Sequence, residues 1–231
     1  MKEFLLDLFF PKFCISCQKE GDYLCEDCLS LLEILEYSFC LCKKPQRLPD
    51  AGRCKRCKHQ SLNGLFFAFS YENLFAKKLI SQFKYNPQVK ELAKTLSFLI
   101  IAHFNLLEKP LESWKDFILV PVPLTNKKKR KRGFNQAEEL GKELRKSLGI
   151  PLVKDCLLKI KETPPQIELQ KEERLEAQKG VFLVKNKGEI KERKLLLVDD
   201  VYTTGATMKE CAKVLKIAGA KEVWGVAIAR G

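Results

Sequence analysis

The chain has 231 residues, of which 45% are hydrophobic and 31% charged, and its formal net charge at pH 7 is +13. This composition is in the range of an ordinary soluble protein, with enough apolar residues for one sizeable core and a small appendage. It excludes a membrane-spanning class, because no stretch reaches the roughly 18 apolar residues that a spanning helix needs, and we expect a cytoplasmic protein.

The positive charge is unevenly distributed. Residues 1–60 contain ten Lys/Arg against nine Asp/Glu, so almost all of the excess, +12, lies in residues 61–231. The run KKKRKR at Lys127–Arg132 supplies half of that excess. Such an excess favours polyanionic partners, either nucleic acid or a phosphate-rich substrate. Solubility alone explains the same charge, so composition leaves both interpretations open.

The first eleven residues superficially resemble a signal peptide. Asp7 interrupts their apolar run, however, and no small-residue cleavage site follows. We therefore expect a short amphipathic helix that ends at Pro11.

Two cysteine pairs early in the chain predict a zinc site. Cys14-x2-Cys17 and Cys25-x2-Cys28 are separated by seven residues. At this distance two such knuckles can place four thiolates tetrahedrally around one zinc ion.

A second set of cysteines, Cys40-x-Cys42 and Cys54-x2-Cys57, predicts another zinc site with less regular spacing. His59 is an alternative ligand there, and interleaved ligation between the two sets is equally open. We expect residues 1–60 to form a cysteine-rich zinc-ribbon domain whose folding depends on one zinc or two. Its near-neutral charge favours docking over DNA binding by the ribbon alone.

Residues 61–231 alternate strands with amphipathic helices. The predicted strands are Phe66–Tyr71, Phe117–Val122, Val181–Val184, Lys194–Val198 and Glu222–Ala229. The predicted helices are Leu74–Lys84, a helix from Pro87 to Leu106, Phe134–Leu148 with Asn135 as N-cap and Gly149 as C-cap, and Ala206–Ala218. This order predicts an α/β fold with a parallel sheet flanked by helices.

The segment after strand Lys194–Val198 has the chemistry of a phosphate site. Asp199 and Asp200 come first, and a turn with Thr203, Thr204, Gly205 and Thr207 then leads into a helix. Hydroxyls, a glycine and a helix N-terminus present several donors to one phosphate. The two carboxylates suit sugar hydroxyls, directly or through a divalent cation. A turn in which Asp and Thr only cap the helix is the simpler alternative.

The string Leu195–Thr207, LLLVDDVYTTGAT, resembles the thirteen-residue phosphoribosyl-pyrophosphate (PRPP) motif of type I phosphoribosyltransferases. The resemblance implies that Asp199 and Asp200 are the catalytic carboxylates and bind the ribose hydroxyls, while the turn holds the 5-phosphate. The PRPP-binding residues that it implies are Val198, Asp199, Asp200, Val201, Tyr202, Thr203, Thr204, Gly205, Ala206 and Thr207.

PRPP also needs its pyrophosphate held together with Mg²⁺. The candidate is the loop expected within Val120–Gln136, at the same edge of the sheet and dense in cations. Its candidate residues are Lys127, Lys128, Lys129, Arg130, Lys131, Arg132, Gly133 and Asn135. Six cations exceed what one pyrophosphate requires, so a nucleic-acid patch is the alternative or additional role.

Several features together resemble the ComF family of competence proteins, a branch of type I phosphoribosyltransferases. They are the VPVP strand, the sequence Arg-Gly-Phe-Asn-Gln at Arg132–Gln136, the paired cysteines and a later series, which comprises Thr163, Gln166, Leu169 and Arg174. Ala177 stands where the family usually has Asn. The resemblance implies a lid over residues 159–174, with Thr163, Gln166 and Arg174 contacting the ligand.

Two functions follow for testing. The ComF resemblance implies a PRPP-binding protein that handles single-stranded DNA in natural transformation, with a helicase as partner. The alternative is a nucleotide-metabolism phosphoribosyltransferase with an unknown acceptor and no role in DNA. We assign Cys156, Cys211, His103, Trp114 and Trp224 to the core rather than to catalysis.

Overall fold

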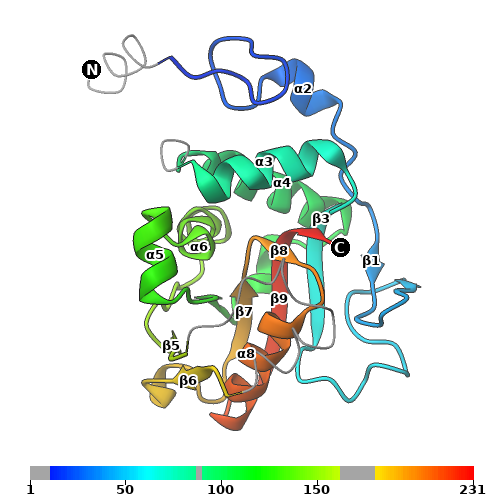
Figure 1. Cartoon of the computed structure of the whole chain (residues 1–231). Coiled ribbons are helices and arrows are strands. Elements are labelled where there is room, and N and C mark those ends of the chain that lie inside the picture. The colour runs from blue at the N-terminus through cyan, green and yellow to red at the C-terminus, as the bar shows by residue number, and fades with distance from the viewer. Residues whose placement is uncertain (1–10, 87–89, 162–179) are drawn as a thin grey trace.

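The computed structural model describes residues 11–86, 90–161 and 180–231, and a parallel sheet lies at its centre (Figure 1). The strand order is β3-β9-β7-β4, every neighbouring pair is parallel, and the short β8 pairs with the end of β9. The strands are β3 (Gly64–Ser70), β4 (Phe117–Pro121), β7 (Lys194–Val198), β8 (Val201–Tyr202) and β9 (Glu222–Arg230). The predicted parallel α/β sheet is confirmed.

Helices cover both faces of this sheet. Along β7, Leu196 and Val198 join one hydrophobic cluster, and Leu195 and Leu197 join a second, because successive side chains point to opposite faces. The first cluster contains the apolar faces of α3 (Leu74–Tyr85), α4 (Leu92–Leu106) and α6 (Gln136–Leu148). The second contains the apolar face of α8 (Ala206–Ile217). Burial on both faces explains why these strands are continuous apolar runs.

Capping residues set the helix ends close to their predicted positions. Asn135 has an extended backbone and its side chain accepts a hydrogen bond from the Ala137 N–H, so α6 begins at Gln136 rather than at Phe134. Gly149 ends α6 in the left-handed conformation, as predicted. The helix predicted from Pro87 is observed from Leu92, and Pro87 itself lies outside the described residues.

The basic segment departs from prediction, because it forms a helix, α5 (Asn126–Arg132), and not a loop. The Thr125 side chain caps its start by accepting from the Lys128 N–H at 3.4 Å, and Gly133 ends it with φ 80°. Four cations in the last turn favourably face the negative end of the helix dipole. The helix buries none of its residues, so local capping rather than packing defines it.

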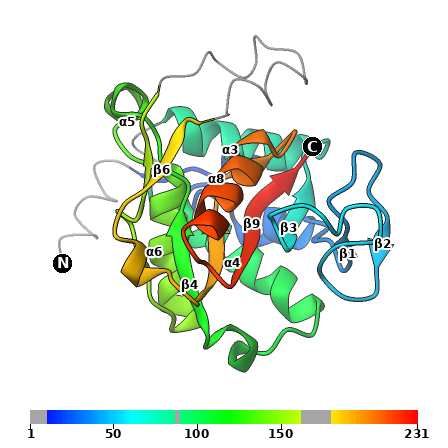
Figure 2. The ribbon, with the colours of Figure 1, turned by 90° about the horizontal axis from the view of Figure 1, so that it is seen from below.

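The two cysteine segments attach to different parts of the sheet. The first, with α2 (Glu26–Ser30), places Cys14, Cys25 and Cys28 in the hydrophobic cluster of α3 and α4. The second, with β1 (Ser38–Phe39) and β2 (Arg47–Leu48), places Cys40 and Cys57 in the cluster of α8. Figures 1 and 2 show β1 at the β3 side of the molecule and α5 at the opposite side.

Strands β5 (Leu157–Lys159) and β6 (Phe182–Val184) form an antiparallel pair. The lid residues Thr163, Gln166 and Arg174 are in the chain between them and lie outside the described residues, as does the N-terminal helix expected over the first eleven residues, apart from Pro11. Within the described ranges, no helix combines the length and apolarity that crossing a membrane requires.

Candidate functional site

The turn between β8 and α8 has the shape that a phosphate-binding loop needs. Gly205 adopts φ 74°, and a Cβ atom at this position would overlap the ring of Tyr202. The Thr204 hydroxyl accepts a hydrogen bond from the Ala206 N–H at 3.3 Å, and α8 begins directly afterwards. The turn and the helix N-terminus therefore form one rigid unit with donors at the carboxyl edge of the sheet.

The acid pair is fixed to the sheet by its backbone. The Asp199 N–H donates to the Val226 carbonyl at 3.0 Å, and the Asp200 carbonyl accepts from the Ile228 N–H at 3.0 Å. The Asp200 N–H also donates to the Asp199 carboxylate at 2.9 Å. Both carboxylates thus follow β7 at defined positions beside the turn.

A lysine from α3 reaches this acid pair. Lys84 Nζ lies 3.0 Å from an Asp200 carboxylate oxygen, and the exposed fractions of the two side chains are only 19% and 10%. Burial would lower the pKa of Lys84, but the attraction and hydrogen bond from Asp200 outweigh it and raise that pKa. Nothing in the local sequence distinguishes Lys84 from other helix-end lysines. Only folding brings it within reach of β7.

Asp199 is the carboxylate whose charge is most strongly disfavoured. Burial and repulsion from the Asp200 carboxylate raise its pKa to about 7, although Lys84 partly opposes this shift. A cation or a hydroxyl donor that reaches the pair would therefore stabilise the ionised form. This is the electrostatic condition expected of a site for a sugar and a divalent cation.

The Arg-Gly-Phe-Asn-Gln segment contacts the end of α3, the helix whose Lys84 pairs with Asp200. Arg132 Nη1 donates to the Gln136 side-chain oxygen at 2.9 Å, and its guanidinium lies 5.7 Å from the centroid of the Tyr85 ring. The buried Gln136 amide in turn donates to the carbonyls of Phe83 and Lys84 at 3.5 and 3.4 Å. Arg132 is therefore placed at the same edge as Lys84 and the acid pair.

The other predicted members of the basic segment are placed differently. Asn135 is buried, with its amide oxygen capping α6 and its nitrogen donating to the Val122 carbonyl at 3.1 Å. The side chains of Lys127, Lys129, Arg130 and Lys131 are exposed, whereas Lys128 and Arg132 are partly buried. Gly133 supplies the left-handed end of α5. The structure thus separates one site-facing arginine from a solvent-facing basic helix surface.

The cysteines come together as two groups of four. The ligand atoms lie within 4.8 Å of one another in Cys14, Cys17, Cys25 and Cys28, and likewise in Cys40, Cys42, Cys54 and Cys57. Because a Zn–S bond is about 2.3 Å, sulfurs around one tetrahedral zinc lie about 3.8 Å apart, so each group could hold a zinc ion. Neither described group is interleaved or uses His59, so these two alternatives are wrong.

Cys156, Cys211, His103 and Trp114 are buried as predicted, whereas Trp224 is only partly buried. His103 Nδ1 lies 2.6 Å from the Leu35 carbonyl, and burial lowers the pKa of its ring to about 4. Cys156 and Cys211 are 1% and 0% exposed, and Trp114 stacks on Phe104. These side chains therefore pack in the protein core.

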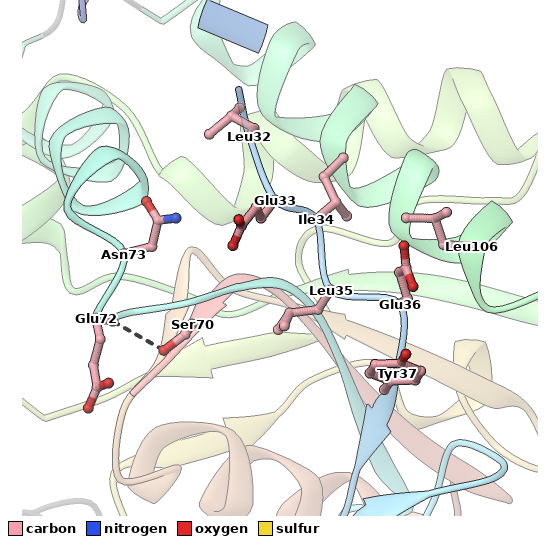
Figure 3. Close-up of a pocket in the computed structure, with 10 residues that line it drawn as sticks. All are labelled: Leu32, Glu33, Ile34, Leu35, Glu36, Tyr37, Ser70, Glu72, Asn73 and Leu106. Carbon is pink, nitrogen blue, oxygen red and sulfur yellow. Dashed lines mark hydrogen bonds between the residues drawn. The ribbon is translucent and has the colours of Figure 1, made fainter. Parts of the chain in front are cut away.

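A surface groove of about 700 Å³ lies between the segment 32–37 and the start of α3 (Figure 3). Leu32, Ile34 and Leu106 line it together with Glu33, Glu36 and other residues. No residue of the turn, the acid pair or α5 lines this groove, so it is separate from the candidate phosphate site.

Comparison with known proteins agrees with this geometry. Residues 130–230, from the end of α5 to the end of β9, match the phosphoribosyl transferase domain family. The sequence is 29% identical to Competence protein F of Haemophilus influenzae over 95% of this chain and 98% of that protein. It is also 29% identical to Competence protein ComFC of Streptococcus pneumoniae, over 89% of this chain and 87% of the relative. Identity to ComFC of Bacillus subtilis is 28%, over 85% and 79% of the two chains. The chain is thus a relative of the competence F and ComFC proteins, as its motifs indicated.

Proposed function

We propose that this protein binds Mg–PRPP at the carboxyl edge of its sheet and acts on single-stranded DNA during natural transformation. The observation that carries the proposal is the meeting of three elements at one edge. They are the turn Thr203–Thr207 at the start of α8, the acid pair that follows β7, and the cations Lys84 and Arg132. A phosphate, a ribose and a pyrophosphate each find a suitable group in this set.

Each part of the ligand has a proposed partner. The turn would hold the 5-phosphate with backbone N–H groups and hydroxyls, and Asp199 and Asp200 would accept from the ribose hydroxyls. Arg132 would neutralise pyrophosphate oxygens. Mg²⁺, when bound with PRPP, supplies further neutralisation of the pyrophosphate. Because Asp200 pairs with Lys84, ligand entry would exchange this ion pair for ligand contacts and release Lys84 to face the phosphates.

The PRPP proposal is tested by calorimetric titration of the full chain with PRPP and Mg²⁺. We expect wild type to bind and Asp200→Asn to lose at least tenfold in affinity, because the variant removes a charged acceptor. Asp116→Asn is the matched control: this exposed carboxylate precedes β4 at the other end of the strands. The proposal fails if wild type and Asp200→Asn give the same titration, with or without binding.

The DNA proposal is supported by the relatives' names as competence proteins and by the exposed basic surface of α5. Fluorescence anisotropy with a labelled single strand would test it. Neutralising α5 to Gln at Lys127, Lys129, Arg130 and Lys131, with Arg132 kept, should weaken binding and flatten its salt dependence.

The matched control for this experiment removes four exposed charges elsewhere. It changes Lys185, Lys187, Lys191 and Lys213 to Gln. Affinity that falls equally in both quadruple variants, or that does not depend on salt, would refute a DNA surface on α5.

Turnover of PRPP is a separate question with its own assay. Pyrophosphate release from PRPP would be measured with candidate bases, amines and single-stranded DNA as acceptors. Release with a nucleobase but not with DNA would favour the nucleotide-metabolism function. PRPP binding without release under any acceptor would favour a sensor that regulates DNA handling.

A further inference from the structure

The last residue of β9, Arg230, forms hydrogen bonds with the backbone of the second cysteine group. Arg230 is 8% exposed, and its two terminal nitrogens donate to the carbonyls of Cys40 and Cys42 at 2.7 and 3.0 Å. These are the two cysteines of the Cys-x-Cys pair. The orientation of the guanidinium therefore depends on the backbone of the two residues whose thiols would bind the metal.

Arg230 also contacts Tyr202, the residue that packs against the phosphate turn. The Tyr202 ring centroid is 5.6 Å from the Arg230 guanidinium carbon, and the two residues are paired between β8 and β9. Tyr202 is 3% exposed, and its hydroxyl has no hydrogen-bond partner among the described residues. Packing and the contact with Arg230, and no side-chain hydrogen bond among the described residues, thus hold the ring.

The ring also occupies the space beside Gly205 that any Cβ atom would need. Contacts therefore run from the cysteine group through Arg230 and Tyr202 to the turn. Figure 1 shows the same order in space: the C-terminal end of β9 lies between β8 and the segment that carries β1.

We propose that Arg230 and Tyr202 are positioning residues for the phosphate turn, and that a metal ion on Cys40, Cys42, Cys54 and Cys57 holds them in place. Four thiolates on one ion fix the carbonyls of Cys40 and Cys42. With those acceptors fixed, the buried guanidinium has one satisfied orientation, which in turn packs Tyr202 under Gly205. The effect on PRPP rests on the proposed function. The effect on the order of the turn does not.

The first cysteine group has no comparable link. It joins the cluster of α3 and α4, and no described hydrogen bond or ring contact runs from Cys14, Cys17, Cys25 or Cys28 to the turn. Loss of a metal ion from this group should therefore leave the turn ordered. The chain thus offers an internal control for the proposal.

The test compares Cys54→Ser with Cys17→Ser in the full chain. Each variant removes one thiolate from one group, and zinc per chain is measured by release to a colorimetric chelator. Hydrogen–deuterium exchange is followed in peptides that cover residues 199–207, and Mg–PRPP affinity is measured by calorimetry. We expect each variant to lose one zinc. Only Cys54→Ser should exchange about tenfold faster at the turn and bind PRPP about tenfold more weakly.

Arg230→Met tests the contacts of Arg230 without removing a metal ligand. It should keep both zinc ions yet exchange as fast at the turn as Cys54→Ser, whereas Arg193→Met, an exposed arginine before β7, should match wild type. This variant also decides the question if Cys54→Ser does not fold. Wild-type exchange at the turn in Arg230→Met, or equal acceleration in Cys17→Ser and Cys54→Ser, would overturn the proposal. Absence of PRPP binding in wild type would refute only the proposed function, because exchange reports on the turn without ligand.

Discussion

The two cysteine groups each bring four sulfur atoms within 4.8 Å of one another, yet they pack against different parts of the fold. The first packs with the helix layer of α3 and α4, while the second packs beside β9 and contacts Arg230. The helix layer reaches the acid pair through the Lys84–Asp200 ion pair, which a ligand can exchange. The β9 side reaches the turn through the packing of Tyr202 beside Gly205. On the proposal made above, a metal ion would serve stability in the first group and the geometry of the turn in the second.

The largest expected effect is on stability, where the two groups should look alike. Cys14→Ser and Cys57→Ser should each lower the unfolding free energy by about 4 kcal/mol, a fraction of the roughly 10–16 kcal/mol that structural zinc contributes in small domains. Urea denaturation would measure this loss. Cys156→Ser changes a buried thiol outside both groups and should cost about 1 kcal/mol without loss of zinc. A loss confined to one group would break the comparison.

Lys84→Met tests the helix-layer connection. It leaves the buried Asp200 without its cation, so we expect a loss of about 3 kcal/mol in unfolding free energy. Lys78→Met, on the exposed face of the same helix, should stay within about 0.5 kcal/mol of wild type. Exchange at the turn Thr203–Thr207 should be unaffected by Lys84→Met, because Tyr202 supports the turn from the other side. Acceleration there would show that both layers hold the turn.

Gly205→Ala tests the packing of Tyr202 against the phosphate turn. Gly205 and Gly149 both have left-handed backbones, with φ 74° and 67°, so alanine at either position should cost about 1 kcal/mol. Only at position 205 does the new methyl group also meet the Tyr202 ring, which should add about 2 kcal/mol. Thermal denaturation of the two variants would compare these costs. Equal costs would mean that the ring yields and does not support the turn.

The smallest expected effect is on pH dependence. Because burial raises the pKa of Asp199 to about 7, its neutral form is favoured in the folded state. The contribution of Asp199 to the unfolding free energy is therefore fully present below the unfolded-state pKa near 4. It is lost as the pH rises from there through 7. We therefore expect the unfolding free energy of wild type to fall relative to that of Asp199→Asn between pH 4.5 and 7.5.

Urea denaturation at several pH values would measure this difference, with Asp116→Asn as the exposed control. His103, whose pKa is lowered to about 4 by burial, titrates in all three proteins and cancels. Parallel pH profiles for wild type and Asp199→Asn would contradict the raised pKa. Mg–PRPP affinity should rise over the same interval as Asp199 ionises.

The sequence alone determined much of the fold and the chemistry of the turn. Strand Lys194–Val198 and the strings that follow it are local patterns, since apolar runs, caps and a glycine in a turn act through near neighbours. The grouping of cysteines by spacing is local for the same reason. The predicted loop over Lys127–Arg132 was wrong because the Thr125 cap and the Gly133 stop outweighed the repulsion between like charges.

Only the tertiary structure decided which cations and supports reach the site. Lys84 ends α3, Arg132 ends α5 and Arg230 ends β9, and no spacing in the sequence relates them to Asp200 or to Cys40. The parallel sheet brings the ends of separate elements to one edge. Burial there lowers the local dielectric constant and strengthens the ion pair of Lys84 and the hydrogen bonds of Arg230. The spacing of the cysteines predicted the two groups, but only the fold placed them in different hydrophobic clusters of the core.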